Sequence, residues 1–133
     1  MKILLAQADA DSREMIGSLL LSEGHEFIVV SDGSEVMGAM QENPDLVIID
    51  ANLPSISGCE CCRLIKHDEK NRHKPVVMLM PDQDSAAWAR FSECGADDFL
   101  EYPLRPHVIK AKLRLLLRIN ELYQRLDANH RHA

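Results

Sequence analysis

Four short runs of apolar residues recur along the chain, and each is followed by a segment with helix-like spacing. The runs are ILLA at 3–6, FIVV at 27–30, LVII at 46–49 and VVML at 76–79, and DFL at 98–100 makes a weaker fifth. Runs this continuous are typical of strands buried on both faces of a parallel sheet. Five repeats of strand and helix with right-handed crossovers predict a three-layer, doubly wound α/β domain.

The intervening segments predict helices. The first begins at Asp11 or Ser12 and stops at Gly24, a residue that readily adopts the left-handed conformation at a helix end. The others run from about Ser34 to Gln41, from Gly58 to about His67, from about Asp84 to Cys94, and onward from Pro106 as a long last helix. In a doubly wound domain the chemistry lies beyond the carboxyl ends of the strands, so the residues that follow each strand are the candidates for a site.

Size and composition fit one globular domain, because the 133 residues are 46% hydrophobic and can bury a sizeable core. The apolar N-terminal stretch is too short for a signal peptide or a membrane span, which predicts a cytoplasmic protein. Residues 103–133 carry seven basic and two acidic residues, but these alternate with Leu and Ile at helical spacing. We therefore expect a solvated helix face there and no nucleic-acid binding.

Three of the four cysteines are crowded together, at Cys59, Cys61 and Cys62, and the fourth is distant at Cys94. This is not the spaced framework of a secreted disulfide protein, so we interpret them as reduced thiols. The three crowded residues spread around one helix and cannot converge on a tetrahedral metal unless that helix breaks.

Four fragments in order resemble the response-regulator receiver domain of two-component phosphorelays. They are PDLVIIDANLPSISG (44–58), PVVMLM (75–80), GADDFLEYPL (95–104) and AKLRLLLR (111–118), and their spacing fits across about residues 2–120. The resemblance implies a flavodoxin-like (βα)5 domain with a five-stranded parallel sheet over residues 1–120 and a helical extension or linker at 121–133. It also implies signal transduction in which a histidine kinase passes a phosphoryl group to an aspartate that follows the third strand, here Asp50.

The resemblance places the metal site on Gln7, Ala8, Asp50 and the backbone carbonyl of Asn52, where the family has an acid pair at the first two positions. Mg²⁺ prefers charged oxygen ligands, and neither Gln7 nor Ala8 supplies one. Asp9 lies one residue late, and a one-residue shift turns a side chain to the opposite face, so it can substitute only in a rebuilt loop. We expect no cofactor, and Mg²⁺ only if the site is functional.

The other functional positions of the family are also altered. Met80 stands where the family has Ser or Thr, and a thioether cannot donate a hydrogen bond. Tyr102 stands in place of a lysine and offers one neutral hydrogen bond instead of a charge. Phe99 occupies the aromatic switch position, where we expect plain core packing. We expect Met80 and Tyr102 to seal a disused site as an apolar plug.

Asp50 is therefore the one chemical side chain that survives, and the sequence predicts a degenerate receiver, or pseudo-receiver. Such a domain is not an enzyme and acts by contact with a histidine kinase or another signalling protein. One alternative is a functional receiver phosphorylated at Asp50, with Asp9 in a rebuilt metal site. Another is a small-ligand or redox-sensing module that uses the cleft and the cysteines.

The last helix carries two apolar stripes. Ile109, Leu113 and Leu116 can face the domain core, while a second stripe needs another surface to cover it. That stripe consists of Leu115, Ile119, Leu122 and Leu126, together with Val108. We expect a homodimer through the fourth helix, fifth strand and fifth helix. About thirteen residues follow the receiver, too few for an output domain. The chain is therefore either a stand-alone signalling module or a piece of a longer protein with a covalently linked output domain, and we expect the latter.

Overall fold

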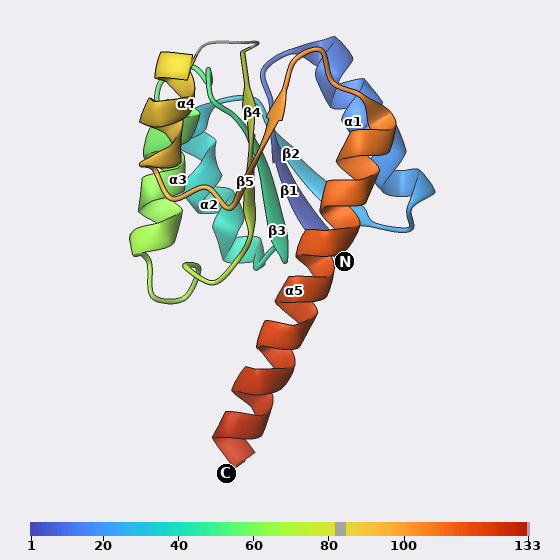
Figure 1. Cartoon of the computed structure of the whole chain (residues 1–133), viewed down its shortest axis with the longest axis vertical. Coiled ribbons are helices and arrows are strands. Elements are labelled where there is room, and N and C mark those ends of the chain that lie inside the picture. The colour runs from blue at the N-terminus through green and yellow to red at the C-terminus, as the bar shows by residue number, and fades with distance from the viewer. Residues whose placement is uncertain (82–84, 133) are drawn as a thin grey trace.

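The computed structural model describes residues 1–81 and 85–132, and its centre is a parallel sheet of five strands with helices on both faces (Figure 1). The strands, in the spatial order β2-β1-β3-β4-β5, are β1 (Lys2–Ala6), β2 (Glu26–Val30), β3 (Leu46–Asp50), β4 (Val76–Met80) and β5 (Asp98–Glu101). The helices are α1 (Ala10–Ser22), α2 (Val36–Ala39), α3 (Gly58–His67), α4 (Ser85–Ser92) and α5 (Pro106–His132). The predicted flavodoxin-like, doubly wound fold is confirmed.

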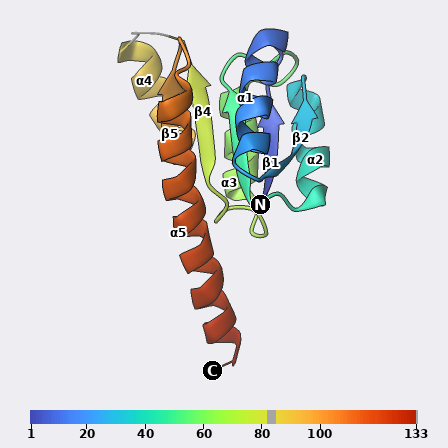
Figure 2. The ribbon, with the colours of Figure 1, turned by 90° about the vertical axis from the view of Figure 1, so that its right-hand side faces the viewer.

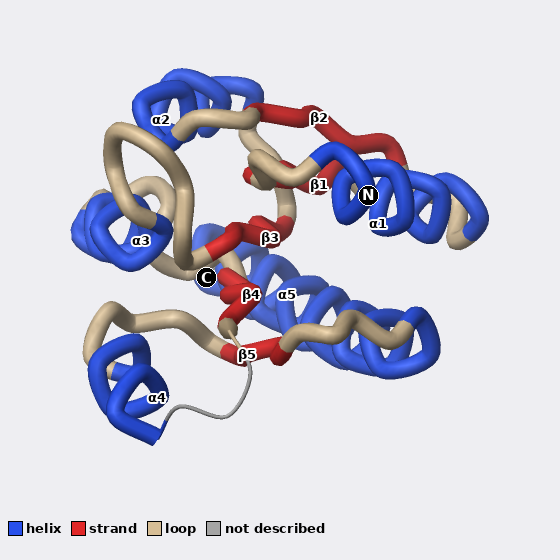
Figure 3. Tube along the Cα trace, turned by 90° about the horizontal axis from the view of Figure 1, so that it is seen from above, coloured by secondary structure: helices blue, strands red, loops and turns tan. Residues whose placement is uncertain are grey.

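Alternating strand residues bury two separate cores, one on each face of the sheet. Ile3 and Leu5 of β1 face α1 and α5, whereas Leu4 and Ala6 face α2, α3 and α4. Figure 3, which looks down on the molecule from above, shows these two groups of helices on opposite sides of the strands. Both faces of β1, β3 and β4 are covered, which explains why these strands read as continuous apolar runs. The edge strand β2 departs from the expectation, because Glu26 and Val29 are exposed.

The helix predictions hold in part. α3 spans the predicted residues and α5 begins at Pro106 as expected, but α1 begins at Ala10, just after Asp9. The segment predicted as a helix from Ser34 to Gln41 is α-helical only over α2, between 3-10 turns at Gly33–Glu35 and Met40–Glu42. A Cβ at Gly33 would lie 1.8 Å from the Ile56 carbonyl oxygen, so close packing against another loop shapes this segment. The predicted start of the fourth helix at Asp84 lies outside the described residues.

Helix α5 starts near the carboxyl edge of the sheet, runs down its face and continues beyond the opposite edge (Figures 1 and 2). Its 27 residues make it about 40 Å long. Asn120 is buried and donates to the Asp45 carbonyl at 3.2 Å, and beyond it the side chains from Glu121 to Leu126 are exposed. No helix within 1–81 and 85–132 is long and apolar enough to cross a membrane.

Candidate functional site

Four predicted site residues follow or end parallel strands at the carboxyl edge of the sheet. Gln7 follows β1, Asp50 ends β3, Met80 ends β4 and Tyr102 follows β5. Strands β1 and β3 are neighbours, while α1 and α3 lie on opposite faces, so the chain diverges at this point and leaves a crevice. The crevice is an open cleft of about 320 Å³, lined by Gln7, Ala8, Asp9, Ser12, Asp50, Asn52, Pro81 and Tyr102.

The Asp50 carboxylate is bound by donors on both oxygens. Oδ2 accepts a hydrogen bond from Gln7 Nε2 at 3.0 Å and a second, short one from the Tyr102 hydroxyl. Oδ1 accepts from the backbone N–H of Asn52 at 2.7 Å. Gln7 Nε2 also donates to the Tyr102 oxygen at 2.6 Å, so the three side chains form a closed cluster.

This cluster is mostly sequestered from water, since Gln7 is 2% and Asp50 8% exposed. Burial and the neighbouring Asp50 carboxylate raise the pKa of Tyr102, because both disfavour a phenolate. The tyrosine therefore remains a neutral hydrogen-bond donor. A charged carboxylate that accepts three hydrogen bonds is a satisfied group, and buried polar groups ordinarily require such partners.

Asp9 lines the cleft, but its carboxylate caps helix α1. Oδ2 accepts from the Ser12 backbone N–H at 3.0 Å and from the Ser12 hydroxyl at 2.8 Å. These bonds hold the pKa of Asp9 below its usual value. The Asp9 backbone N–H in turn donates to Gln7 Oε1 at 3.0 Å. Asp9 thus has a structural role that the sequence interpretation missed, although Asp at a helix N-cap is a recognised signal.

The two carboxylates at this edge are already engaged by hydrogen-bond donors. Both Asp50 oxygens already accept hydrogen bonds, Asp9 is engaged by Ser12, and Ala8 carries no ligand atom. The described residues contain no group of three or more His, Cys, Asp or Glu side chains arranged to hold a metal. The groups that bind the Asp50 carboxylate are neutral hydrogen-bond donors.

Met80 and Phe99 belong to the core and do not line the cleft. Met80 is fully buried, and the ring of Phe99 packs against Trp88 with centroids 4.9 Å apart. The expected apolar plug of Met80 and Tyr102 is therefore wrong, because Tyr102 acts through its hydroxyl and the cleft stays open. Met80 points into the core between the sheet and α2–α4, as the alternation along β4 requires.

Helix α5 has one buried and one exposed apolar stripe, as predicted for every named residue except Val108. Ile109, Leu113 and Leu116 are buried, and Leu117 joins them. The four members of the second stripe, Leu115, Ile119, Leu122 and Leu126, are between 51% and 69% exposed. Val108 departs from the expectation, since it is partly buried against the core that α1 and α5 share.

A model of the response regulator receiver domain matches residues 3–114. The chain is 35% identical over 121 residues to the DNA-binding response regulator MtrA of Mycobacterium tuberculosis, covering 90% of this chain and 52% of MtrA. It is 32% identical over 127 residues to the alkaline phosphatase synthesis transcriptional regulatory protein SphR of Synechococcus elongatus, covering 88% and 49%. The chain thus spans about half the length of these curated relatives.

Solved structures show the same similarity. The signal receiver domain of a signal transduction histidine kinase from Syntrophus aciditrophicus superposes with a TM-score of 0.83 at 30% identity, covering 88% of this chain and 89% of that one. The BeF3-activated N-terminal receiver domain of RstA from Klebsiella pneumoniae gives a TM-score of 0.81 at 28% identity, covering 89% and 99%.

Proposed function

Because the chain belongs to the family of response regulator receiver domains, we propose that it is a signalling domain that acts by protein contact and whose Mg²⁺-dependent phosphorylation is impaired. The observation that carries this proposal is the closed cluster of Gln7, Asp50 and Tyr102. Two of its members occupy positions where the family has a metal-binding acid and a lysine. The surviving aspartate is thus held by neutral groups.

Phosphoryl transfer to Asp50 would meet two obstacles at this edge. The nucleophilic oxygen must be free to attack in line, and both oxygens are engaged by donors. The arriving phosphoryl group also brings negative charge, and no Lys or Arg is among the described residues that line the cleft. Two like unit charges ~4 Å apart repel by about 4 kcal/mol at a protein-surface dielectric, which slows transfer by orders of magnitude.

Acetyl phosphate with Mg²⁺ tests this proposal, with intact-protein mass as the readout. We expect no phosphoryl adduct on the wild type. A variant that restores the family's side chains, Gln7→Asp with Ala8→Asp, Met80→Thr and Tyr102→Lys, should become modified at Asp50. Adding Asp50→Asn to that variant is the matched control and should abolish the adduct. Stoichiometric modification of wild-type Asp50 would instead support a functional receiver.

For the partner surface, we propose self-association through the exposed stripe of α5. Its members Leu115, Ile119, Leu122 and Leu126 are spaced four, three and four residues apart, which is the a/d spacing of a coiled coil. Ile119 and Leu126 fall at one core position and Leu115 and Leu122 at the other, and Ile at a with Leu at d favours a parallel two-stranded coil. A histidine kinase or a covalently linked output domain is the further partner expected for this family.

A further inference from the structure

A cavity of about 250 Å³ lies where α5 leaves the amino edge of the sheet, at the end of the molecule opposite the Asp50 cleft. Helix α5 forms one side of it, and the segments that lead into β4 and β5 form the other. Figures 1 and 2 show α5 passing this edge and continuing beyond it. The walls of the cavity include His73, Asp97, Leu116, Ile119, Asn120 and Tyr123.

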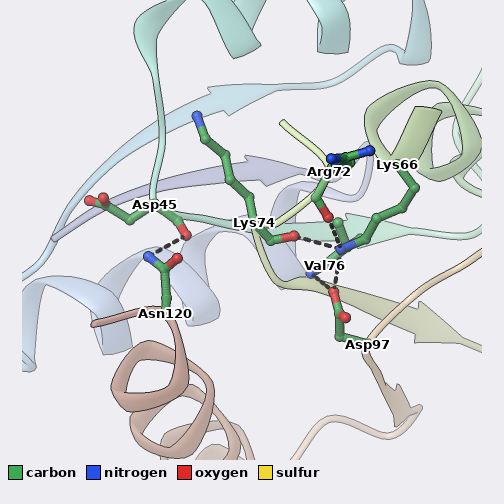
Figure 4. Close-up of polar contacts among 7 residues, drawn as sticks. All are labelled: Asp45, Lys66, Arg72, Lys74, Val76, Asp97 and Asn120. Carbon is green, nitrogen blue, oxygen red and sulfur yellow. Dashed lines mark hydrogen bonds and ion pairs between the residues drawn. The ribbon is translucent and has the colours of Figure 1, made fainter. Parts of the chain in front are cut away.

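Two oxygen atoms of the side chains in these walls have no hydrogen-bond donor within 1–81 and 85–132. Asn120 is 1% exposed and donates from Nδ2 to the Asp45 carbonyl, but its buried Oδ1 accepts nothing (Figure 4). The Oδ2 of Asp97 accepts from the Lys66 ammonium and from the Val76 N–H, both at 2.7 Å, whereas its Oδ1 accepts from neither. Since the Asp97 side chain is 39% exposed, a donor that enters from solvent can reach it. Buried polar groups ordinarily have partners, so the cavity is suited to a group rich in N–H donors.

The cavity also has an aromatic wall. The ring of Tyr123 stacks on the imidazole of His73, with centroids 4.7 Å apart and an angle of 12° between the planes, and Tyr123 remains 45% exposed. A guanidinium is flat and stacks on such a ring, while the apolar side chains of Leu116 and Ile119 suit the methylene stem of an arginine. A carboxylate oxygen, an aromatic ring and apolar walls together match the side chain of arginine.

A second copy of the chain presents an arginine to this cavity. With Ile119 and Leu126 at the a positions of the exposed stripe, Tyr123 occupies an e position, and Arg118 and Arg125 occupy g positions. In a parallel coiled coil a g residue lies beside the e residue of the following heptad on the other helix, so Arg118 of one copy faces Tyr123 of the other. Arg118 is exposed and forms no ion pair with any described residue, which leaves its guanidinium available.

The two arginines also favour the parallel orientation over the antiparallel one. In an antiparallel pair the g positions of the two helices face each other, and the spacing of the stripe would bring Arg118 beside Arg125 of the second copy. Two like charges placed side by side oppose that arrangement. The parallel pair instead places each Arg118 beside an aromatic ring.

We propose that Arg118 of each copy enters the cavity of the other copy in a parallel dimer, where its guanidinium stacks on Tyr123 and donates to Asp97 Oδ1. This contact rests on the proposed self-association through the exposed stripe of α5 and deepens it, because it adds a charged anchor beside the apolar seam. A two-fold symmetric pair makes the contact twice. Since the cavity is built partly from the segments before β4 and β5, the contact joins the helix of one copy to the receiver domain of the other.

Sedimentation equilibrium of the full chain tests this contact through the dissociation constant of the dimer. Arg118→Met keeps an unbranched apolar stem and removes the guanidinium, and we expect a dissociation constant about tenfold higher, because two cation–π contacts are lost in each dimer. Arg125→Met is the matched control. It removes the same charge from the same side of the helix one heptad farther along, away from the cavity, and should change the dissociation constant by less than about twofold.

Variants of Tyr123 test the other side of the contact. Tyr123→Phe keeps the ring and should leave the dissociation constant within about twofold of the wild type, whereas Tyr123→Leu should raise it about tenfold. Combining Tyr123→Leu with Arg118→Met should add little, because either change alone already removes the stacking. Circular dichroism should show equal helix content in all variants.

Two outcomes separate this contact from the self-association on which it rests. A wild-type dimer that Arg118→Met weakens no more than Arg125→Met does, or fully additive effects of Arg118→Met and Tyr123→Leu, would overturn the contact and leave the dimer in place. A wild type that stays monomeric at high concentration would overturn both.

Discussion

Among single residues, Tyr102 contributes two hydrogen bonds to the cluster around Asp50, because its hydroxyl accepts from Gln7 and donates to the carboxylate. Tyr102→Phe keeps the half-buried ring and removes only the hydroxyl. Hydrogen bonds to charged groups are worth about 1.5–3 kcal/mol, so we expect the free energy of unfolding at pH 7 to fall by about 1–3 kcal/mol in urea denaturation. The control Tyr123→Phe removes the hydroxyl of an exposed tyrosine, and its effect should stay within about 0.5 kcal/mol. Equal stability of the two variants would contradict the role of Tyr102.

The same tyrosine predicts a pH dependence. Its pKa is raised in the folded protein, so the folded state holds the phenolic proton more tightly than the unfolded chain, whose tyrosines ionise near pH ~10. The stabilisation is therefore fully present below about pH 10 and is lost as the pH rises above that value. Denaturation curves collected between neutral and alkaline pH should show a steeper loss of stability for the wild type than for Tyr102→Phe. If the stability of both proteins fell equally with pH, the pKa of Tyr102 would not differ between the folded and the unfolded state.

At the scale of elements, Lys66 joins the end of α3 to the start of β4 and to the turn before β5. Its ammonium donates to two backbone carbonyls and to the Asp97 carboxylate (Figure 4). Asp97 also accepts a hydrogen bond from the Val76 backbone N–H at 2.7 Å. Lys66→Met preserves the length of the side chain and leaves those acceptors without their charged donor. We expect a loss of about 2–3 kcal/mol in the free energy of unfolding.

The matched control for this change is Lys70→Met, which alters an exposed lysine in the turn after α3. Its free energy of unfolding should lie within about 0.5 kcal/mol of the wild type, measured in the same urea series. If Lys66→Met lowered the free energy of unfolding no more than Lys70→Met does, the contacts of Lys66 would contribute no more to stability than ordinary surface ion pairs.

The helices and strands whose position depends on local sequence patterns could be predicted from the sequence. The central strands follow from apolar runs buried on both faces, and α3 begins after Ser57, whose hydroxyl accepts from the Glu60 N–H at 3.2 Å. The segment around α2 could not be predicted, because its shape depends on the contact of Gly33 with the distant Ile56. At the site, the strand-end positions were predicted, but not the bonds of Gln7 to Asp50 across 43 residues and to Tyr102 across 95 residues. Such contacts depend on tertiary geometry that no local pattern encodes.

At the scale of the whole molecule, α5 connects the two features that define this receiver. It begins four residues after Tyr102, beside the Asp50 cluster, and its far end projects beyond the opposite edge of the sheet (Figures 1 and 2). Its buried stripe ties it to the core, whereas its exposed stripe offers apolar side chains that no other described element covers. The α5 helix of a second copy, packed in parallel as a coiled coil, would cover these side chains. The two receiver domains would then lie at the same end of the coil.

Leu122→Glu tests that arrangement, because it places a carboxylate in the middle of the exposed stripe on a side chain that is 52% exposed in the monomer. We expect sedimentation equilibrium to show a wild-type dimer and a variant whose dissociation constant is at least about tenfold higher, since burial of an unpaired charge at a helix interface costs more than ~1.4 kcal/mol. Gln124→Glu is the matched control: it adds the same charge at an exposed position nearly opposite on the helix and should leave the dissociation constant unchanged. Circular dichroism should show equal helix content in both variants, so that a change in association reflects the interface and not unfolding of α5. A wild type that remains monomeric at high concentration, or equal weakening by both substitutions, would rule out the exposed stripe as the dimer contact.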